Sequence, residues 1–284
     1  MPKVALAQLA VSADREANRT AALKAVEQAA RAGATLIVFP EMGFDPFFPQ
    51  HRADPRYFDW AEPIPGPTVE RLQAAARADR IAIVANLFER AGPGEYYDAS
   101  PVIDADGRLL GRSRMAHIAE APYFNEKFYY RPGDGEFAVY DSQAGKLGVA
   151  ICYDRHYPEQ LRILALRGCE ILAVPLAAIS REQWSMFEME MQVASFQNQY
   201  WSVVVNRVGR EDRMEFIGRS FVTDPFGRVV ARAADGAPDL LIVDIDIAMI
   251  DAARRVIPHF RDRRPELYAP IATPDGSPKG KANS

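Results

Sequence analysis

Short apolar runs alternate with helical patterns along nearly the whole chain, and this alternation constrains the fold more than any other feature. Strand-like runs lie at residues 4–11 and 35–39, and the alanine-rich segment 14–32 between them has the spacing of an amphipathic helix. Further helices are expected at 68–78, 158–167 and 184–198, and further strands at 81–88, 146–152, 170–175, 201–206 and 240–246. The order predicts an α/β fold built in layers.

Two hairpin signals interrupt this alternation. Asp106-Gly107 separates the runs 101–104 and 108–114, and Pro225-Phe226-Gly227 separates 216–224 from 228–231. Hairpins add antiparallel pairs, so mixed sheets are expected. Since no internal repeat or linker interrupts the pattern, we expect one domain over residues 1–270 and a disordered tail at 271–284.

Composition limits the classes of function. The chain has 284 residues, of which 48% are hydrophobic and 25% charged. A protein of this size buries most of its apolar surface without the help of disulfides or structural metals. The formal net charge is −4 and no Lys/Arg-rich tract occurs, so no nucleic-acid partner is expected. Positive charge is carried mostly by arginine. The six lysines are Lys3, Lys24, Lys127, Lys146, Lys279 and Lys281.

The chain also lacks signals for secretion or membrane insertion. Two cysteines make no disulfide framework and are interpreted as reduced thiols. The first residues reach acidic and polar side chains too early for a secretory signal. The longest apolar run, 171–179, contains Pro175 and is too short to span a bilayer. We therefore expect a cytoplasmic protein with no membrane partner.

Three polar residues stand out as candidates for chemistry. Glu41 follows the apolar run TLIVFP, and Cys152 lies between the run KLGVAI and the helical segment that begins near Pro158. Such strand ends are where α/β proteins tend to place their sites. Glu126 is the third, in the loop segment PYFNEKFYYRPGD.

A thiol at a strand-to-helix turn can take backbone N–H donors, which lower its pKa and can bind an oxyanion. A nearby carboxylate could then act as general base. Taken singly, these residues have simpler explanations: a free cysteine is typically a buried structural residue, and Glu41 could cap a turn. Cys169 is interpreted as a core thiol. The four histidines lack metal-ligand spacing, so no metal site is expected.

Four segments taken together are more specific. FPEMGFDPF, HIAEAPYFNEKFYYRPGD, GVAICYDRHYPEQLR and FRDRRPELY resemble, in order and spacing, the nitrilase superfamily of carbon–nitrogen hydrolases, and within it the N-carbamoyl amine and N-carbamoyl amino-acid amidohydrolases. The similarity runs from about Lys3 to Tyr268. It implies a four-layer α-β-β-α sandwich, a Glu-Lys-Cys triad and a small-molecule substrate. It also implies no metal or organic cofactor, and protomers that pair through one helical face as a homodimer or higher homo-oligomer.

The resemblance assigns roles to single residues. Glu41 matches the family's general base, Cys152 its nucleophile, and Glu126 a second glutamate that positions substrate or the attacking water. The family's lysine stands two residues before the histidine of a Lys-x-His-Ile/Leu motif, and here that position is Met115. The interval from Met115 to Glu126 also matches. A smaller departure is Asp98, where relatives usually have asparagine.

Met115 puts turnover in question. The implied lysine holds the oxyanion and balances the charge of the base, and methionine has neither charge nor donor. Losing one oxyanion donor typically costs about 100- to 1,000-fold in rate. Three interpretations stay open: another cation substitutes, the chain is a non-catalytic homologue that binds a ligand or partner, or the methionine traps a complex. Candidate substitutes are Lys127, Arg112 and Arg114, although Arg114 should point away from Met115 if this segment is a strand.

Other positions bear on the substrate. The resemblance implies that Arg155 receives a substrate carboxylate, for which a planar guanidinium is suited, although a surface arginine is an alternative. His156 is interpreted as a core or substrate-contacting residue, and His117 as a hydrogen-bonding residue near the site. Phe48, in the aromatic loop after Glu41, either contacts an apolar substrate tail or packs the loop down. The leading hypothesis is a cysteine-dependent amidohydrolase that releases ammonia from an N-carbamoyl compound or simple amide.

Overall fold

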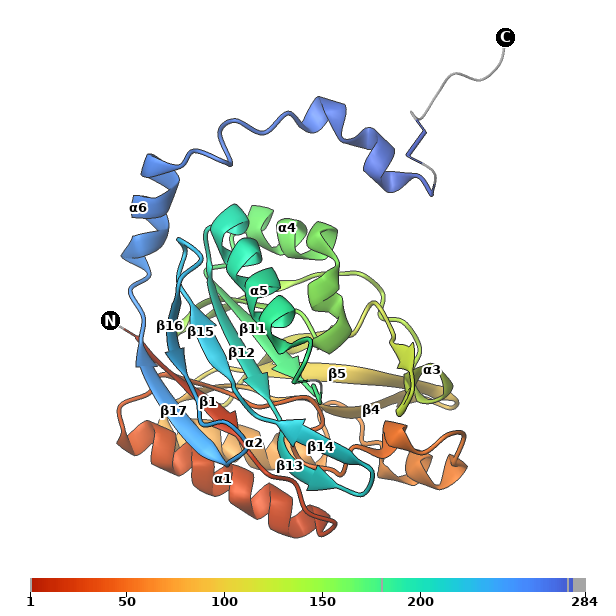
Figure 1. Ribbon diagram of the computed structural model, residues 1–284. Helices are drawn as coiled ribbons and strands as arrows, with labels where there is room; N and C mark the ends of the chain where they lie inside the picture. Colours follow the sequence, from red (N-terminus) through yellow and green to blue (C-terminus); the bar gives the residue numbers. More distant parts are fainter. Residues whose placement is uncertain (1, 180, 275, 278–284) are drawn as a thin grey trace.

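The structure is a computed structural model that describes residues 2–179, 181–274 and 276–277 (Figure 1). Its first sheet has the strand order β17-β1-β2-β3-β5-β4, with β6 paired to β5. These strands are β1 (Lys3–Gln8), β2 (Leu36–Val38), β3 (Ala82–Val84), β4 (Leu87–Gly92), β5 (Glu95–Ile103), β6 (Leu109–Arg114) and β17 (Asp239–Asp244). Helices α1 (Arg15–Arg31) and α2 (Pro67–Asp79) cover its outer face.

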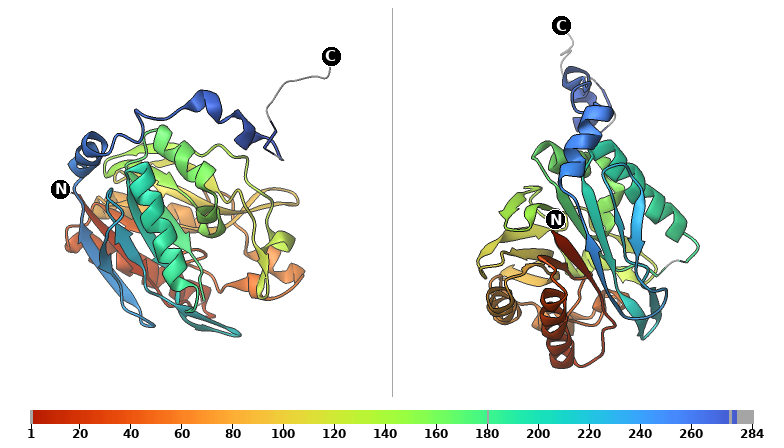
Figure 2. Two further views of the ribbon diagram at one scale, coloured as in Figure 1. Left: turned by 45° about the horizontal axis from the view of Figure 1, so that its top comes forward. Right: turned by 90° about the vertical axis from the view of Figure 1, so that its left-hand side faces the viewer.

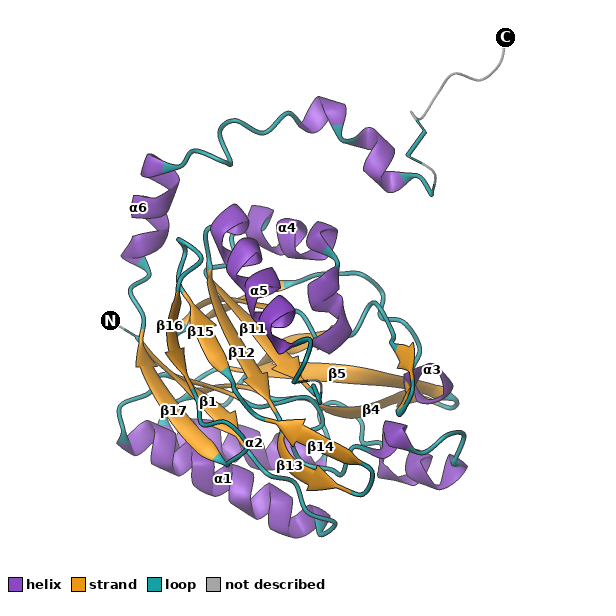
Figure 3. Cartoon of the chain, viewed as in Figure 1, coloured by secondary structure: helices purple, strands orange, loops and turns teal. Residues whose placement is uncertain are grey.

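The second sheet has the order β16-β15-β12-β11-β10-β9. Its strands are β9 (Val139–Ser142), β10 (Gly145–Val149), β11 (Ile171–Leu176), β12 (Trp201–Asn206), β15 (Phe221–Thr223) and β16 (Val229–Arg232). Helices α4 (Pro158–Leu166) and α5 (Trp184–Asn198) lie on its outer side (Figure 3). None of the helices in the described part of the chain combines the length and apolar character needed to cross a membrane.

The remaining elements are short. They are α3 (Glu126–Tyr129), α6 (Ala248–Val256), the hairpins β7 (Glu120–Ala121) with β8 (Phe124–Asn125) and β13 (Val208–Glu211) with β14 (Met214–Ile217), and 3₁₀ turns at Phe48–Gln50, Pro55–Trp60, Cys152–His156, Pro265–Leu267 and Ala269–Ala272. After α6 the chain leaves the sandwich as an extended arm (Figure 2). The predicted tail at 271–284 falls partly on residues 275 and 278–284, which lie outside the described residues.

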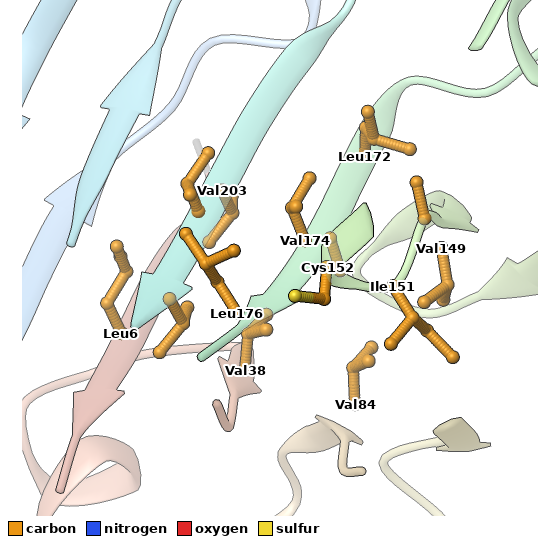
Figure 4. Packing of buried hydrophobic residues seen from close by; sticks show 14 of the residues in the cluster. Leu6, Val38, Val84, Val149, Ile151, Cys152, Leu172, Val174, Leu176 and Val203 are labelled. Carbon is orange, nitrogen blue, oxygen red and sulfur yellow. The ribbon is translucent and has the colours of Figure 1, made fainter. Parts of the chain in front are cut away.

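Residues that alternate along β1 divide between two cores. Val4 and Leu6 belong to the core between the sheets, whereas Ala5 and Ala7 pack against the outer helices. Figure 4 shows the inter-sheet core. There Leu6 and Val38 of the first sheet lie opposite Val174, Leu176 and Val203 of the second. The expected four-layer α-β-β-α sandwich is confirmed.

Two strand predictions are wrong. The run 81–88 is not one strand but is divided between β3 and β4, which pair one after the other along the same edge of β5, while β6 pairs with its other edge. The chain breaks at Asn86, whose side chain turns inward to bond Met42 N and Asp98. The run 216–224 is also divided, because Gly218, at φ 69°, separates β14 from β15.

A buried arginine ties the loop after β2 to the second sheet. Arg207, 0% exposed, follows β12 and forms an ion pair with Glu211 at 2.6 Å. Its Nη1 donates to the carbonyl of Glu41 at 2.8 Å and also to that of Met42, and its Nη2 donates to the carbonyl of Asp45 at 3.1 Å. One guanidinium therefore fixes the backbone on both sides of Glu41.

Replacing this arginine should destabilise the protein strongly. Arg207→Met leaves the Glu211 carboxylate buried without its cation, and breaking such a pair typically costs about 3–5 kcal/mol. Chemical denaturation would measure the loss. The fully exposed Arg56, which pairs with Asp54, supplies the control, and Arg56→Met should leave the unfolding midpoint nearly unchanged. Equal midpoints for the two variants would contradict the role given to Arg207.

Candidate active site

Glu41 lies three residues beyond the end of β2, fully buried. Neither of its carboxyl oxygens has a hydrogen-bond partner in the described part of the chain, and the Cys152 thiol and the Asp98 carboxyl both act on its pKa. Burial, and after it the charge of Glu126, raises the pKa of Glu41 to about 8. A carboxyl with such a pKa exchanges a proton near neutral pH, as a general base requires.

Cys152 occupies a strained turn between β10 and the helix α4. Its φ is 44°, in the left-handed region that a non-glycine residue adopts at a cost of about 1–3 kcal/mol. The Asp154 side chain fixes this turn by hydrogen bonds. Its carboxylate accepts from the N–H groups of Ile151 at 3.2 Å, Ala116 at 3.1 Å and His117 at 3.0 Å. The turn is thereby bonded to the segment that follows β6.

The resting thiol of Cys152 is neutral. Burial, followed by the charge of Glu41, raises its pKa well above the ordinary range, and the nearby Arg155 only partly opposes that shift. A thiolate therefore forms only if a neighbouring base takes the proton. Glu41 is in place to do so.

Glu126 begins α3 and faces the same space as Cys152. It is fully buried, and one of its oxygens accepts from the N–H of Ala119 at 3.3 Å. Burial, and then the charge of Asp98, raises the pKa of Glu126 to about 8. The three predicted residues Glu41, Cys152 and Glu126 therefore come together from three separate parts of the chain.

A cavity of about 590 Å³ opens onto Cys152 and Glu126. Its wall combines polar groups, including Arg155 and His156, with apolar side chains such as Phe124 and Phe187. A volume of this size, with few polar groups on a largely apolar wall, suits a small organic molecule.

Arg155 lies against the nucleophile position. The side chain is buried, its Nη1 donates to the Cys152 carbonyl at 2.7 Å, and the same nitrogen is 4.0 Å from the Cys152 Sγ. Its guanidinium stacks over Phe187, with the carbon 4.3 Å from the ring centroid, and Nε lies 3.6 Å from Glu190. The alternative of a surface arginine is therefore excluded.

The other predicted substrate-contacting residues divide into two groups. His156 lines the cavity and its Nδ1 lies 2.8 Å from Glu190 Oε1. Phe48 does not line it, because its ring is buried against Phe88 and Tyr129. His117 also lies outside the lining, with its Nδ1 2.8 Å from the Asp154 carboxylate.

Met115 is buried and packs into the core between the sheets. The cations proposed as substitutes for the lysine do not reach the cavity. Lys127 is exposed on α3, and Arg112 and Arg114 both pair with Glu89, at 2.8 Å and 2.7 Å. Arg114 thus points away from Met115, as the strand pattern indicates.

Residues that the sequence left without a role complete the site. Asp98, fully buried on β5, accepts from Asn86 Nδ2 at 2.5 Å, and Asn86 Oδ1 accepts from the N–H of Met42 at 2.7 Å. In the sequence, Asp98 could be noticed because relatives usually have asparagine at that position. No sequence feature pointed to a role for Asn86 or Asp154. Among the residues with a described placement, no group of His, Cys, Asp and Glu side chains could hold a metal ion.

Comparison with known proteins identifies the family. The carbon–nitrogen hydrolase family matches residues 3–255. The chain is 35% identical to an N-carbamoylputrescine amidase from Arabidopsis thaliana, over 95% of each protein. It is also 35% identical to a citrullinase from Francisella tularensis, over 95% of this chain and 97% of the relative.

Solved structures of carbon–nitrogen hydrolases and amidases have a similar fold. A carbon–nitrogen hydrolase from Helicobacter pylori G27 matches with a TM-score of 0.91 and 30% identity, covering 96% of this chain and 99% of that one. A mutant of an amidase from Nesterenkonia sp. AN1, with the acetamide moiety of fluoroacetamide added covalently at its active-site cysteine, matches with a TM-score of 0.77 and 26% identity, over 94% and 95% of the chains. The chain therefore belongs to the carbon–nitrogen hydrolase family of the nitrilase superfamily and is a hydrolase of carbon–nitrogen bonds.

Proposed function

We propose that the chain is a cysteine-dependent amidohydrolase that releases ammonia from an N-carbamoyl amine or N-carbamoyl amino acid, or from a simple amide. The observation that carries this proposal is the placement of Cys152 and Glu126 on the wall of one cavity, with Glu41 buried directly beside the thiol. The relatives named N-carbamoylputrescine amidase and citrullinase support the carbamoyl class.

The proposed reaction moves one proton through Glu41 in each half. Glu41 takes the proton of the Cys152 thiol while the sulfur attacks the carbamoyl carbon. As the carbon–nitrogen bond breaks, Glu41 returns that proton to the leaving nitrogen, and ammonia departs. Water, positioned by Glu126, then attacks the carbon of the thioester-type intermediate and gives a proton to Glu41. The carbon–sulfur bond breaks as Glu41 returns this proton to the sulfur, which restores the thiol. The carbamic acid released from an N-carbamoyl compound then decomposes to carbon dioxide and the free amine.

Ammonia release should depend on Cys152 and not on Cys169. Both thiols are buried, but burial raises the pKa of Cys169 to about 12 and that residue does not line the cavity. On a panel of N-carbamoyl amines, N-carbamoyl amino acids and simple amides, Cys152→Ala should lose all turnover and Cys169→Ala should keep it. Met115→Lys should raise the rate by restoring the oxyanion donor, by up to about 100- to 1,000-fold.

The competing function is a catalytically impaired homologue that binds a small ligand, and Met115 is the observation that favours it. The same panel separates the two functions. Turnover confined to Met115→Lys would mean that the native chain is the impaired form. Turnover that survives Cys152→Ala would overturn the proposed mechanism itself.

Arg155 has two candidate tasks at this site. Arg155 Nη1 lies 4.0 Å from Cys152 Sγ, which places positive charge where the thiolate forms. The planar guanidinium, with its paired N–H donors, also suits a substrate carboxylate. We propose that it does both, because Nη1 already serves Cys152 while Nε has no hydrogen-bond partner.

Arg155→Met should therefore lower kcat on carboxylate-free amides as well as on N-carbamoyl amino acids, by about 10- to 100-fold, the worth of a charge-assisted contact. An additional rise in KM is expected only for substrates that carry a carboxylate. Steady-state kinetics on a matched pair, one N-carbamoyl amine and its amino-acid counterpart, would measure both. Unchanged kcat on the amine would leave Arg155 as a carboxylate receptor alone.

We also propose a homodimer, formed through the outer face of α5. Met186, Met189, Val193 and Phe196 recur at helical spacing on that face and are exposed. The arm beyond α6 exposes further apolar side chains, Leu267 and Ile271 among them. A row of exposed apolar side chains of this kind is typical of a protein–protein interface.

A charge in this row should dissociate the dimer. Met189→Glu combined with Val193→Glu places carboxylates at its centre, so sedimentation should show monomers where the parent protein shows dimers. Val230→Glu is the matched control, since Val230 is as exposed but lies on β16. A double variant with the parent's mass would exclude this face as the interface.

The two free cysteines support a cytoplasmic location. Neither Cys152 nor Cys169 is in a disulfide, and the proposed chemistry requires that Cys152 remain a thiol. Reducing compartments keep thiols in this state.

A further inference from the structure

Three carboxyl groups meet at the base of the site without a lysine. Glu41, Asp98 and Glu126 are each fully buried, and Met115 occupies the position where the resemblance implies a cation. Arg207 is nearby but is bound to Glu211 and to backbone carbonyls. Burying several uncompensated negative charges together is costly, so the cluster must hold protons.

The surroundings of Asp98 determine which of its oxygens is free. Asn86 donates one amide hydrogen to Asp98 Oδ1 at 2.5 Å and the other to Ser100 Oγ at 3.1 Å. The backbone of Asp98 is fixed as well, since its carbonyl accepts from the N–H of Met115 at 2.9 Å. Asp98 Oδ2, like both carboxyl oxygens of Glu41, has no hydrogen-bond partner among the described residues, and Glu41 is the acid whose charge raises the pKa of Asp98 most.

Two carboxyl groups in contact are stable only when they share a proton. We propose that Asp98 is protonated in the resting protein and donates a hydrogen bond to the Glu41 carboxylate, in place of the ammonium that Met115 does not supply. Asp98 is thus a positioning residue for the base. This inference refines the proposed function, but the hydrogen bond itself does not depend on turnover.

The electrostatics support a proton that is retained by this pair of carboxyl groups. Burial, followed by the charge of Glu41, raises the pKa of Asp98 well above its usual range. The other titratable or charged groups that act on this pair are Cys152, Glu126, Asp154, Tyr130 and Arg207.

This arrangement keeps the charge of the cluster constant during the reaction. In the reactive form, in which Asp98 and Glu126 each hold a proton, the cluster has one negative charge, on Glu41. When Glu41 takes the thiol proton, both acids are neutral and the charge is on the sulfur, 4.0 Å from Arg155 Nη1. Asp98 thus takes over the charge balance implied for the lysine, and Arg155 stabilises the charge on the sulfur.

Infrared spectroscopy of protein labelled with ¹³C-aspartate tests the protonation directly. Near neutral pH the parent should show a protonated aspartate band that disappears in Asp98→Asn. It should also disappear in Met115→Lys, because an ammonium allows both carboxyls to ionise. Asp104→Asn is the control, since Asp104 is similarly buried but accepts from Gln143 N at 2.9 Å and faces Arg108 at 3.6 Å. A band that persists in Asp98→Asn would overturn the proposal.

The pH dependence of Cys152 alkylation tests the hydrogen bond. Thiolate formation requires ionised Glu41, so the rate should rise with pH through about 8. Asp98→Ala removes the donor, which raises the pKa of Glu41 and moves this rise to higher pH. Asp98→Asn keeps a donor and should move it less. If Asp98 were an anion, both variants would move the rise to lower pH, and that result or no shift at all would overturn the proposal.

These two measurements need no turnover. A protein with the expected band and alkylation profile that released no ammonia would contradict the proposed function and leave the role of Asp98 intact. A protein that released ammonia but lacked the band would support the proposed function and contradict the role of Asp98.

Discussion

The face-to-face packing of the two sheets is the constraint on which the site depends. Glu41 follows β2 of the first sheet and Cys152 follows β10 of the second, and only the packing of Leu6, Val38, Val174 and their neighbours brings these strand ends together. Arg207 secures the junction, because its guanidinium reaches from the end of β12 to the carbonyl groups around Glu41. The nucleophile and its base are therefore held by the larger of the two hydrophobic cores of the described residues, whose close packing resists local displacement.

Burial then sets the chemistry. The cavity admits a small molecule on one side of Cys152, while Glu41 and Asp98 are closed off from water on the other. Low polarity raises the pKa of both glutamates to about 8, so that each exchanges protons near neutral pH. The same burial makes every uncompensated charge in the cluster costly. The methionine at position 115, which supplies no positive charge, and the acid at position 98, which can hold a proton, therefore affect the same charge balance.

Much of the fold could be predicted because its signals are local. Period-two and helical patterns located most helices and strands, and hairpin residues indicated mixed sheets. Predictions failed where a strand ended on a tertiary contact: Asn86 divides the run 81–88 because its side chain bonds Met42 and Asp98, which are distant in sequence. The strand Val139–Ser142 and the helix Ala248–Val256 also escaped prediction. For the site, motif spacing identified Glu41, Cys152 and Glu126 and the unusual Met115.

The sequence by itself determined the layered class, the family resemblance and the candidate nucleophile and acids, since these depend on residue type and spacing along the chain. Tertiary structure decided which cations reach them. Lys127, adjacent to Glu126 in sequence, is exposed to solvent, whereas the Arg155 guanidinium lies against Cys152. Asp98 on β5 and Glu41 after β2 act on each other although they are far apart in sequence. Electrostatic partnership depends on distance through the folded interior and on the exclusion of water, and neither is a property of chain order.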